Sequence, residues 1–180
     1  ALWIYGVDGT DSASMEDAHR AAATEVESVT EYLRESEPEL FGDARLAGVA
    51  PQFYIRDGRH LLGLYRLSAA DVMLGHAYSD GVAVGGYPLD GQVYLPGETP
   101  YLLGTPVPYE VPFRTLVPFG MSNLLVVSQA ASFDSTAAFS ARVVPLQVAL
   151  GQAAGVAAGV ALASGVDFPG LAWDPRAMEV

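Results

Sequence analysis

Pro145 stands near the start of 24 residues without a charge, from Val143 to Val166, and predicts a helix that begins there. A proline suits the first turn of a helix, where its missing N–H is no loss. The N–H groups of Leu146, Gln147 and Val148 would then point out of the helix start. They would face an anion or a carbonyl oxygen, since first-turn amides lack partners inside the helix.

Arg142 lies three residues before this proline and is the only charge between Asp134 and Asp167. It has two interpretations that the sequence leaves open: a structural salt bridge, or contact with an anionic substrate. His60, Tyr87 and Asp134 are the candidates for proton transfer, because their side chains can donate or accept a proton. No spacing joins these three residues into a known catalytic motif.

Two elements would position these residues. The apolar run from Asn123 to Val127 is typical of a strand that is buried on both faces. In the charge-free run, Gly151, Gly155 and Gly159 recur every fourth residue and so lie along one ridge of a helix. Glycine within a helix costs about 1 kcal/mol relative to alanine. The ridge therefore predicts close packing, for example against a sheet.

The same run raises the question of a membrane span, because about 20 apolar residues can cross a bilayer. Gln147 and Gln152 lie inside it, Pro145 lies near its start, and no cluster of basic residues flanks it. We therefore expect a buried helix of a soluble protein and no contact with a membrane.

Several segments resemble the C-terminal end of the FAD-dependent oxidoreductases related to the glutathione-reductase-type flavoproteins. The matching segments are YEVPFRTLVP (109–118), SNLLVVSQ (122–129), RVVP (142–145) and ALGQAAG (149–155), with PQFYIRDGRHLLGLYRLSAADV (51–72) and GGYPLDG (85–91) before them. Their order is that of the family. The resemblance covers roughly residues 50–165.

This resemblance implies an α/β fold, in which the chain supplies the C-terminal strand and helix of a Rossmann-like FAD-binding domain. It also implies three parts. Residues 1–118 would form a β-rich substrate-side or cap region, residues 119–165 the C-terminal segment of the FAD-binding domain, and residues 166–180 a tail.

The resemblance also implies the site. The turn Val144–Gln147 would direct its amides toward N1 and the C2 carbonyl of a flavin, where the reduced ring holds negative charge. Val127, Ser128 and Gln129 would meet the nucleotide at the end of the strand. Arg142 would contact the flavin or an anionic substrate. The flavin-binding set is therefore Val127, Ser128, Gln129, Arg142, Val144, Pro145, Leu146 and Gln147, and the catalytic set is Arg142, His60, Tyr87 and Asp134.

The sequence departs from the family in three respects. The family usually has Gly-Arg after its strand, and this chain has Ser128-Gln129. The loop that often carries two histidines has Ser135 and Ala138 instead. No G-x-G-x-x-G follows a predicted strand, so the fingerprint that binds the dinucleotide is missing from this chain. We therefore expect the cofactor FAD, a small-molecule substrate, and an N-terminal FAD-binding half supplied by the same gene or by a partner chain.

Composition excludes several classes of function. The net charge of −12 disfavours nucleic acid as a partner. The chain has no cysteine and no lysine, which excludes a redox dithiol, Schiff-base chemistry and a P-loop within it. No signal-peptide pattern opens the sequence, and a cytoplasmic protein is expected.

An FAD-dependent oxidoreductase segment is the favoured function. The alternative is a non-catalytic, truncated or split relative that acts as an interaction or assembly module. A hydrolase ranks third, because Gly120-Met121-Ser122 lacks the second glycine of a nucleophile elbow.

Local patterns predict the remaining elements. Apolar residues from Met15 to Leu33 recur at steps of three and four and predict an amphipathic helix capped by Ser14. Asp57-Gly58 predicts a tight hairpin between strands at 53–56 and 60–65. Ser68 with Asp71 predicts a short helix, and residues 81–86 a strand.

Overall fold

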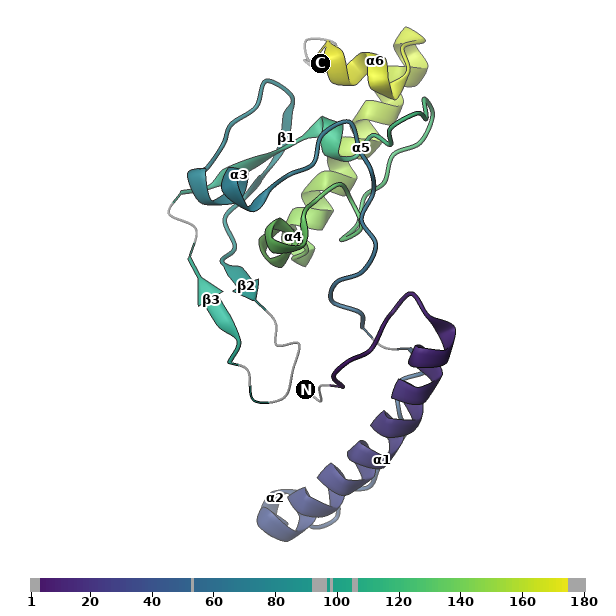
Figure 1. The fold of residues 1–180 in the computed structure, drawn as a ribbon, viewed down its shortest axis with the longest axis vertical. Helices are drawn as coiled ribbons and strands as arrows, with labels where there is room; N and C mark the ends of the chain where they lie inside the picture. Colours follow the sequence, from purple (N-terminus) through teal and green to yellow (C-terminus); the bar gives the residue numbers. More distant parts are fainter. Residues whose placement is uncertain (1–3, 53, 92–96, 98, 105–106, 175–180) are drawn as a thin grey trace. The chain divides into compact units, whose positions relative to one another are not determined.

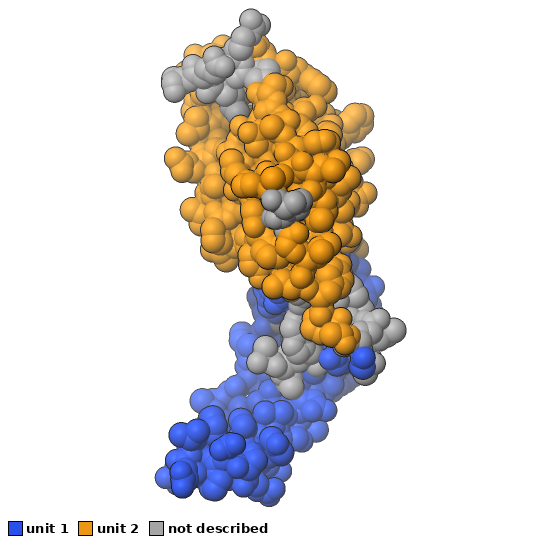
Figure 2. Space-filling model, turned by 90° about the vertical axis from the view of Figure 1, so that its left-hand side faces the viewer, with its two compact units in different colours: residues 1–58, 94–98 blue, residues 59–93, 99–180 orange. Residues whose placement is uncertain are grey.

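The structure is a computed structural model and describes residues 4–52, 54–91, 97, 99–104 and 107–174. The chain divides into two compact units, residues 1–58 with 94–98 and residues 59–93 with 99–180 (Figure 2). Residues 59–93 and 99–118 therefore share a unit with residues 119–165. A functional boundary at residue 118 stays a prediction.

The first unit contains a long helix, α1 (Ser12–Ser36), and a short one, α2 (Pro38–Phe41) (Figure 1). The predicted amphipathic helix is confirmed, and Ala18 and Ala22 are its buried residues. The predicted cap was wrong, because the Asp11 carboxylate accepts the N–H groups of Ala13 and Ser14. The hydroxyl of Ser14 accepts the N–H of Asp8 instead.

The second unit mixes short sheets with helices, consistent with the α/β class (Figure 1). Its elements are α3 (Ala69–Leu74), β1 (Gly81–Gly85), β2 (Leu89–Gly91), β3 (Tyr101–Leu103), β4 (Tyr109–Pro112), the 3-10 turn η1 (Phe113–Thr115), α4 (Ser135–Ala141), α5 (Val144–Ser164) and α6 (Phe168–Trp173). β1 pairs antiparallel with β4, and β2 pairs antiparallel with β3. Within the described residues these are the sheets, and neither is parallel.

Local signals account for several of these elements. The Ser68 hydroxyl accepts the N–H of Asp71, and the Asp71 carboxylate accepts the N–H of Ser68, which confirms the capping box of α3. Gly75 ends that helix at φ 63°, a conformation that glycine adopts without strain. The predicted strand at 81–86 is confirmed as β1.

The core of the second unit lies where α4, α5 and α6 meet the strands and η1. Phe113, Phe133, Leu150 and Leu171 are almost completely buried in it. β1 contacts α5, and α6 contacts both α5 and η1. The start of α5 is therefore held by core packing.

The predicted strand at Asn123–Val127 is not formed. The segment is extended, and within the described residues its one recorded backbone hydrogen bond runs from Val126 N–H to the Leu116 carbonyl, at 2.9 Å. Leu124 is 41% exposed. The segment has no flanking strands among the described residues, and without them its apolar sequence cannot form a buried ladder.

The predicted hairpin is also wrong for its described residues; Phe53 lies outside them. The backbone of residues 60–67 bonds to segments distant in sequence instead. Leu61 N–H donates to the Ala130 carbonyl at 2.7 Å, and Leu64 N–H donates to the Val117 carbonyl at 3.0 Å. These long-range bonds replace the ladder that the Asp57-Gly58 turn predicted.

α5 begins as predicted, with proline in its first turn. The predicted close packing of its glycines is wrong in this structure, because a Cβ added at Gly151, Gly155 or Gly159 would meet no atom of the described residues within 4 Å beyond the neighbouring backbone of the helix itself. Only Leu146, Leu150 and Ala157 of the helix are buried. The expectation of a buried helix is therefore not met within the described residues, and by length and composition alone α5 could cross a membrane.

Candidate functional site

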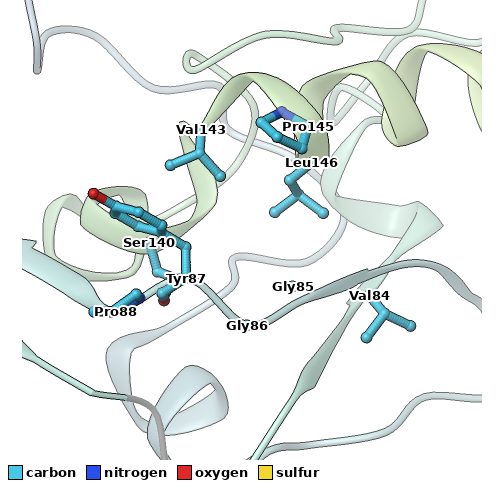
Figure 3. Close-up of a pocket in the computed structure, with 9 residues that line it drawn as sticks. All are labelled: Val84, Gly85, Gly86, Tyr87, Pro88, Ser140, Val143, Pro145 and Leu146. Atoms are coloured by element: carbon cyan, nitrogen blue, oxygen red, sulfur yellow. The ribbon is translucent and has the colours of Figure 1, made fainter.

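A cavity of about 450 Å³ opens at the first turn of α5 (Figure 3). Its size lies within the range typical of small-molecule sites. The end of β1 with the loop that follows it forms one wall, and the start of α5 forms the other. The lining residues are Val84, Gly85, Gly86, Tyr87, Pro88, Ser140, Val143, Pro145 and Leu146.

Among the residues that the structure describes, no side chain caps the amides in the first turn of α5. Val143 occupies the N-cap position, and a valine side chain has no acceptor. Uncapped first-turn amides carry the positive end of the helix dipole. Pro145 and Leu146 line the cavity, so this end of the dipole borders it.

The amide of Gln147 was predicted to point out of the helix start, and this detail is wrong. Gln147 N–H donates to the Val143 carbonyl at 3.1 Å. The side-chain Nε2 donates to the Ala141 carbonyl at 2.7 Å, and Oε1 is buried without a hydrogen-bond partner among the described residues. Gln147 thus joins α4 to α5 and leaves one acceptor unused near the cavity.

The opposite wall is held by a chain of buried hydroxyls. The Ser140 hydroxyl donates to the backbone carbonyl of Tyr87, and the Tyr109 hydroxyl lies 2.7 Å from the same Ser140 oxygen. Ser140 is fully buried and Tyr109 is 1% exposed. Burial raises the pKa of the Tyr109 phenol, which therefore stays protonated.

Glycine is required at one position of this wall. A Cβ at Gly85 would come within 2.4 Å of the Tyr109 ring. β1 can therefore approach Tyr109 of β4 this closely only because residue 85 has no side chain. At Gly86 a Cβ would meet no atom within 4 Å. The wall therefore has no room for a side chain at Gly85, next to β4, and has room for one at Gly86.

Arg142 is 7% exposed and is not among the residues that line the cavity. Its Nη2 lies 3.3 Å from a carboxylate oxygen of Asp90, and its guanidinium lies 5.8 Å from the centre of the Phe139 ring. Of the two interpretations that the sequence leaves open, this geometry favours the structural salt bridge. Contact with a cofactor stays a prediction.

The structure brings some of the predicted site residues together and keeps others apart. Tyr87, Pro145 and Leu146 line the cavity, while Val144, 73% exposed, lies beside them on the helix. Val127–Gln129 form a half-exposed turn that is not among the lining residues.

His60 and Asp134 are also outside the lining set. His60 Nδ1 lies 3.4 Å from the Ala131 carbonyl. The Asp134 carboxylate accepts the N–H groups of Ala137 and Ala69, at 2.6 and 2.9 Å, and so caps both α4 and α3. That structural use of Asp134 leaves its carboxylate oxygens occupied.

Sequence reasoning did not name six of the lining residues as site residues: Val84, Gly85, Gly86, Pro88, Ser140 and Val143. The GGYPLDG segment carried a usable signal, because Gly85–Pro88 belong to it and it is one of the blocks that resemble the family. Ser140 carried no signal, since a serine in an alanine-rich helix predicts nothing about its partners.

A second group of titratable side chains surrounds Asp71, outside the cavity. The Asp71 carboxylate accepts the hydroxyls of Tyr65 and Ser68, at 2.9 and 2.8 Å, and pairs with His76 Nδ1 at 2.7 Å. Burial alone would raise the pKa of Asp71, but hydrogen bonds from Ser68 and His76 lower it to about 2. Burial raises the pKa of the neighbouring Tyr78 phenol.

Arg114 lies beside this group and is also structural in its contacts. Its guanidinium forms two hydrogen bonds with the Asp80 carboxylate, at 2.8 and 3.0 Å, and lies over the rings of Tyr65 and Trp173. The hydrogen bonds with the Asp80 carboxylate raise the pKa of Arg114, so the arginine stays protonated.

The family model described as FAD dependent oxidoreductase matches residues 3–175, nearly the whole chain. The chain has no significant match among curated proteins or solved structures.

Proposed function

Because the chain belongs to the FAD-dependent oxidoreductase family, whose members use FAD, we propose that it closes a flavin site with the first turn of α5. The observation that carries the proposal is an uncapped helix start bordering a cavity of about 450 Å³. When bound, FAD supplies the redox chemistry, and the chain supplies charge and shape.

The residues present fit part of such a cofactor. Apolar side chains of Val143, Leu146 and Pro88 suit a flat aromatic ring, and an uncapped helix start suits its negative edge. Val144–Gln147 are proposed to hold that edge. The N–H groups of Val144 and Leu146 at the positive end of the helix dipole would favour the reduced, negatively charged ring by about 0.3–1 kcal/mol, more where water is excluded.

We further propose that the rest of the FAD site comes from an N-terminal FAD-binding half, in the same polypeptide or a partner chain. The fingerprint that binds a dinucleotide is missing from the sequence, and the described residues contain no parallel sheet. A Rossmann-type FAD site uses both, so this chain is proposed to act only with that half.

Two surfaces suit a sheet supplied by that half. The extended segment at Asn123–Val127 is apolar and makes few backbone hydrogen bonds, so it could join a parallel sheet as one of its strands. The glycine ridge of α5 is bare and open, so a backbone could approach it closely. The substrate is proposed to be a small molecule that reaches the flavin beside the Gly85–Pro88 wall.

The test is to express the chain together with the FAD-binding half that its reading frame or operon encodes, and to measure bound flavin by its visible absorption after gel filtration. We expect stoichiometric FAD in the combined protein and little in the chain alone. A combined protein that stays colourless after incubation with FAD would overturn the proposal.

A second candidate is a non-catalytic module that binds the FAD-binding half without turnover. Ser135 and Ala138 favour it, because they stand where relatives often carry histidines, and in the structure they lie in α4, where Ala138 is buried. A stable complex that reduces no artificial electron acceptor would favour this candidate over the enzyme.

A further inference from the structure

The end of α4 and the residue that follows it form hydrogen bonds with the GGYPLDG segment (residues 85–91) at two points. Ser140 donates its hydroxyl proton to the Tyr87 carbonyl, and two residues later Arg142 donates to the Asp90 carbonyl at 3.3 Å. Both side chains are buried, with Ser140 at 0% and Arg142 at 7% exposure. The segment that forms one wall of the cavity is therefore tied to the helix that leads into the other wall.

The direction of the hydrogen bonds at Ser140 follows from its single proton. Because Ser140 donates to the Tyr87 carbonyl, it must accept from the Tyr109 hydroxyl, 2.7 Å away. Tyr109 in turn lies opposite Gly85 in the β1–β4 pair. The chain from Tyr109 through Ser140 to Tyr87 thus joins β4, α4 and the cavity wall.

Only two residues, Ala141 and Arg142, separate Ser140 from Val143, which occupies the N-cap position of α5 and lines the cavity. A shift of Tyr87 relative to Ser140 would therefore change the separation between the Gly85–Pro88 wall and the first turn of α5 (Figure 3). Without the Ser140 hydroxyl, the Tyr87 carbonyl would lose this donor, and the wall would no longer be held at this point.

We propose that Ser140 is a positioning residue, whose hydroxyl holds the Gly85–Pro88 wall at its distance from the first turn of α5. The consequence for the cofactor rests on the proposed function: the same hydroxyl sets how tightly the flavin edge is enclosed. Ser140 itself acts through the Tyr87 backbone.

The first test is amide hydrogen exchange on the 180-residue chain, without FAD. Ser140→Ala removes the hydroxyl, and Ser140→Cys keeps nearly the same volume but donates only weakly. We expect both to accelerate exchange in peptides that contain Gly85–Tyr87 by about tenfold, which corresponds to losing one typical hydrogen bond. Ser132→Ala is the matched control, because Ser132 is equally buried and its hydroxyl accepts a hydrogen bond from the backbone N–H of Gly63.

Unchanged exchange in both Ser140 variants would overturn the inference, as would equal acceleration in Ser132→Ala. If Ser140→Ala fails to fold, Ser140→Cys is measured alone, since it keeps nearly the same side-chain volume and donates only weakly. It should accelerate exchange in the same peptides, and no acceleration there would overturn the inference.

The second test uses the holoprotein assembled with the FAD-binding half. We expect Ser140→Ala to shift the flavin reduction potential and raise the FAD dissociation constant about tenfold, with Ser132→Ala unchanged. Wild-type protein that binds no FAD overturns the proposed function, while faster exchange in the chain would still support Ser140 as the positioning residue. Faster exchange with an unchanged FAD dissociation constant and potential overturns the link to the flavin.

Discussion

Arg142 and Asp90 form an ion pair at the edge of the core, with Nη2 of the arginine 3.3 Å from both a carboxylate oxygen and the backbone carbonyl of the aspartate. The arginine side chain is 4% exposed and the aspartate side chain 23%. The pair joins the GGYPLDG and RVVP segments, which lie about 50 residues apart in the sequence.

A double-mutant cycle will separate the two roles of Arg142. Arg142→Ala leaves Asp90 without this partner and should lower the free energy of unfolding by about 2–3 kcal/mol, less than for a fully buried pair. Asp90→Ala should cost a similar amount, and the double variant no more than the worse single one. Urea unfolding of all four proteins measures this.

The same variants in the FAD-containing protein test contact with the flavin. If Arg142 acts only through Asp90, both single variants should weaken flavin retention equally. A larger loss in Arg142→Ala than in Asp90→Ala would assign the arginine a direct contact. Unchanged flavin retention and turnover in both would remove the pair from the site.

Charge at the first turn of α5 should tune the flavin. Val144→Asp places a carboxylate at the first residue of α5. There it stabilises the helix but opposes negative charge on a reduced flavin ring. We expect a more negative reduction potential, equivalent to about 0.3–1 kcal/mol, with the helix retained. A reductive titration against a reference dye gives the potential.

Val144→Asn and Val148→Asp are the controls for this substitution. Val144→Asn adds a polar group without charge. Val148→Asp adds the charge one helical turn further along, at a residue that is 66% exposed. Both should shift the potential less than Val144→Asp. Equal shifts in all three would argue against a flavin edge at the first turn.

Asp71 should make the second unit sensitive to acid. Its pKa is lowered from 3.8 to about 2, so its stabilising effect is complete above about pH 4 and is lost as pH falls through 2. A shift of this size corresponds to about 2 kcal/mol. Asp71→Asn should therefore unfold at lower urea near pH 6 and lose less stability on acidification than the wild type.

An exposed carboxylate provides the comparison. Asp17 lies on α1 with a side chain 71% exposed and pairs with Arg20. Asp17→Asn should leave the urea midpoint nearly unchanged between pH 6 and pH 3 relative to wild type. An acid profile of Asp71→Asn identical to that of the wild type would contradict the role of Asp71.

The sequence signals that succeeded are local ones. Pro145 predicts the start of α5 because its ring fixes a helical φ and needs no donor, and the Ser68–Asp71 box predicts α3 for a similar reason. Such preferences act within one helical turn and depend little on how the rest of the chain folds. For Gly85–Pro88, the sequence indicated only that the segment resembles part of the family and did not predict that it forms a cavity wall.

The signals that failed depend on residues far away in the sequence. Asp57-Gly58 predicts a hairpin, but residues 60–67 find donors and acceptors near residues 115 and 131. The apolar run at Asn123–Val127 predicts a buried strand, yet a strand needs neighbours that the described residues do not offer. Ser140 depends on Tyr87 and Tyr109, 53 and 31 residues away, and nothing local reports them.

The glycine ridge of α5 gives a prediction whose sign depends on the partner. In the chain alone, Gly155→Ala meets open space and should raise the free energy of unfolding by up to about 1 kcal/mol, because alanine favours the helix. In the protein assembled with its FAD-binding half, the proposed sheet lies against that ridge. There the added methyl should weaken assembly or FAD retention.

Urea unfolding of the chain and flavin absorption of the assembled protein measure the two effects. Gly165→Ala is the matched control, because Gly165 ends the same helix at φ 71°, and alanine should be unfavourable there in both settings. A Gly155→Ala variant that is stabilised both alone and assembled would place the ridge in solvent in the complete protein. The partner sheet would then have to cover another face of α5, and the proposed arrangement would be wrong.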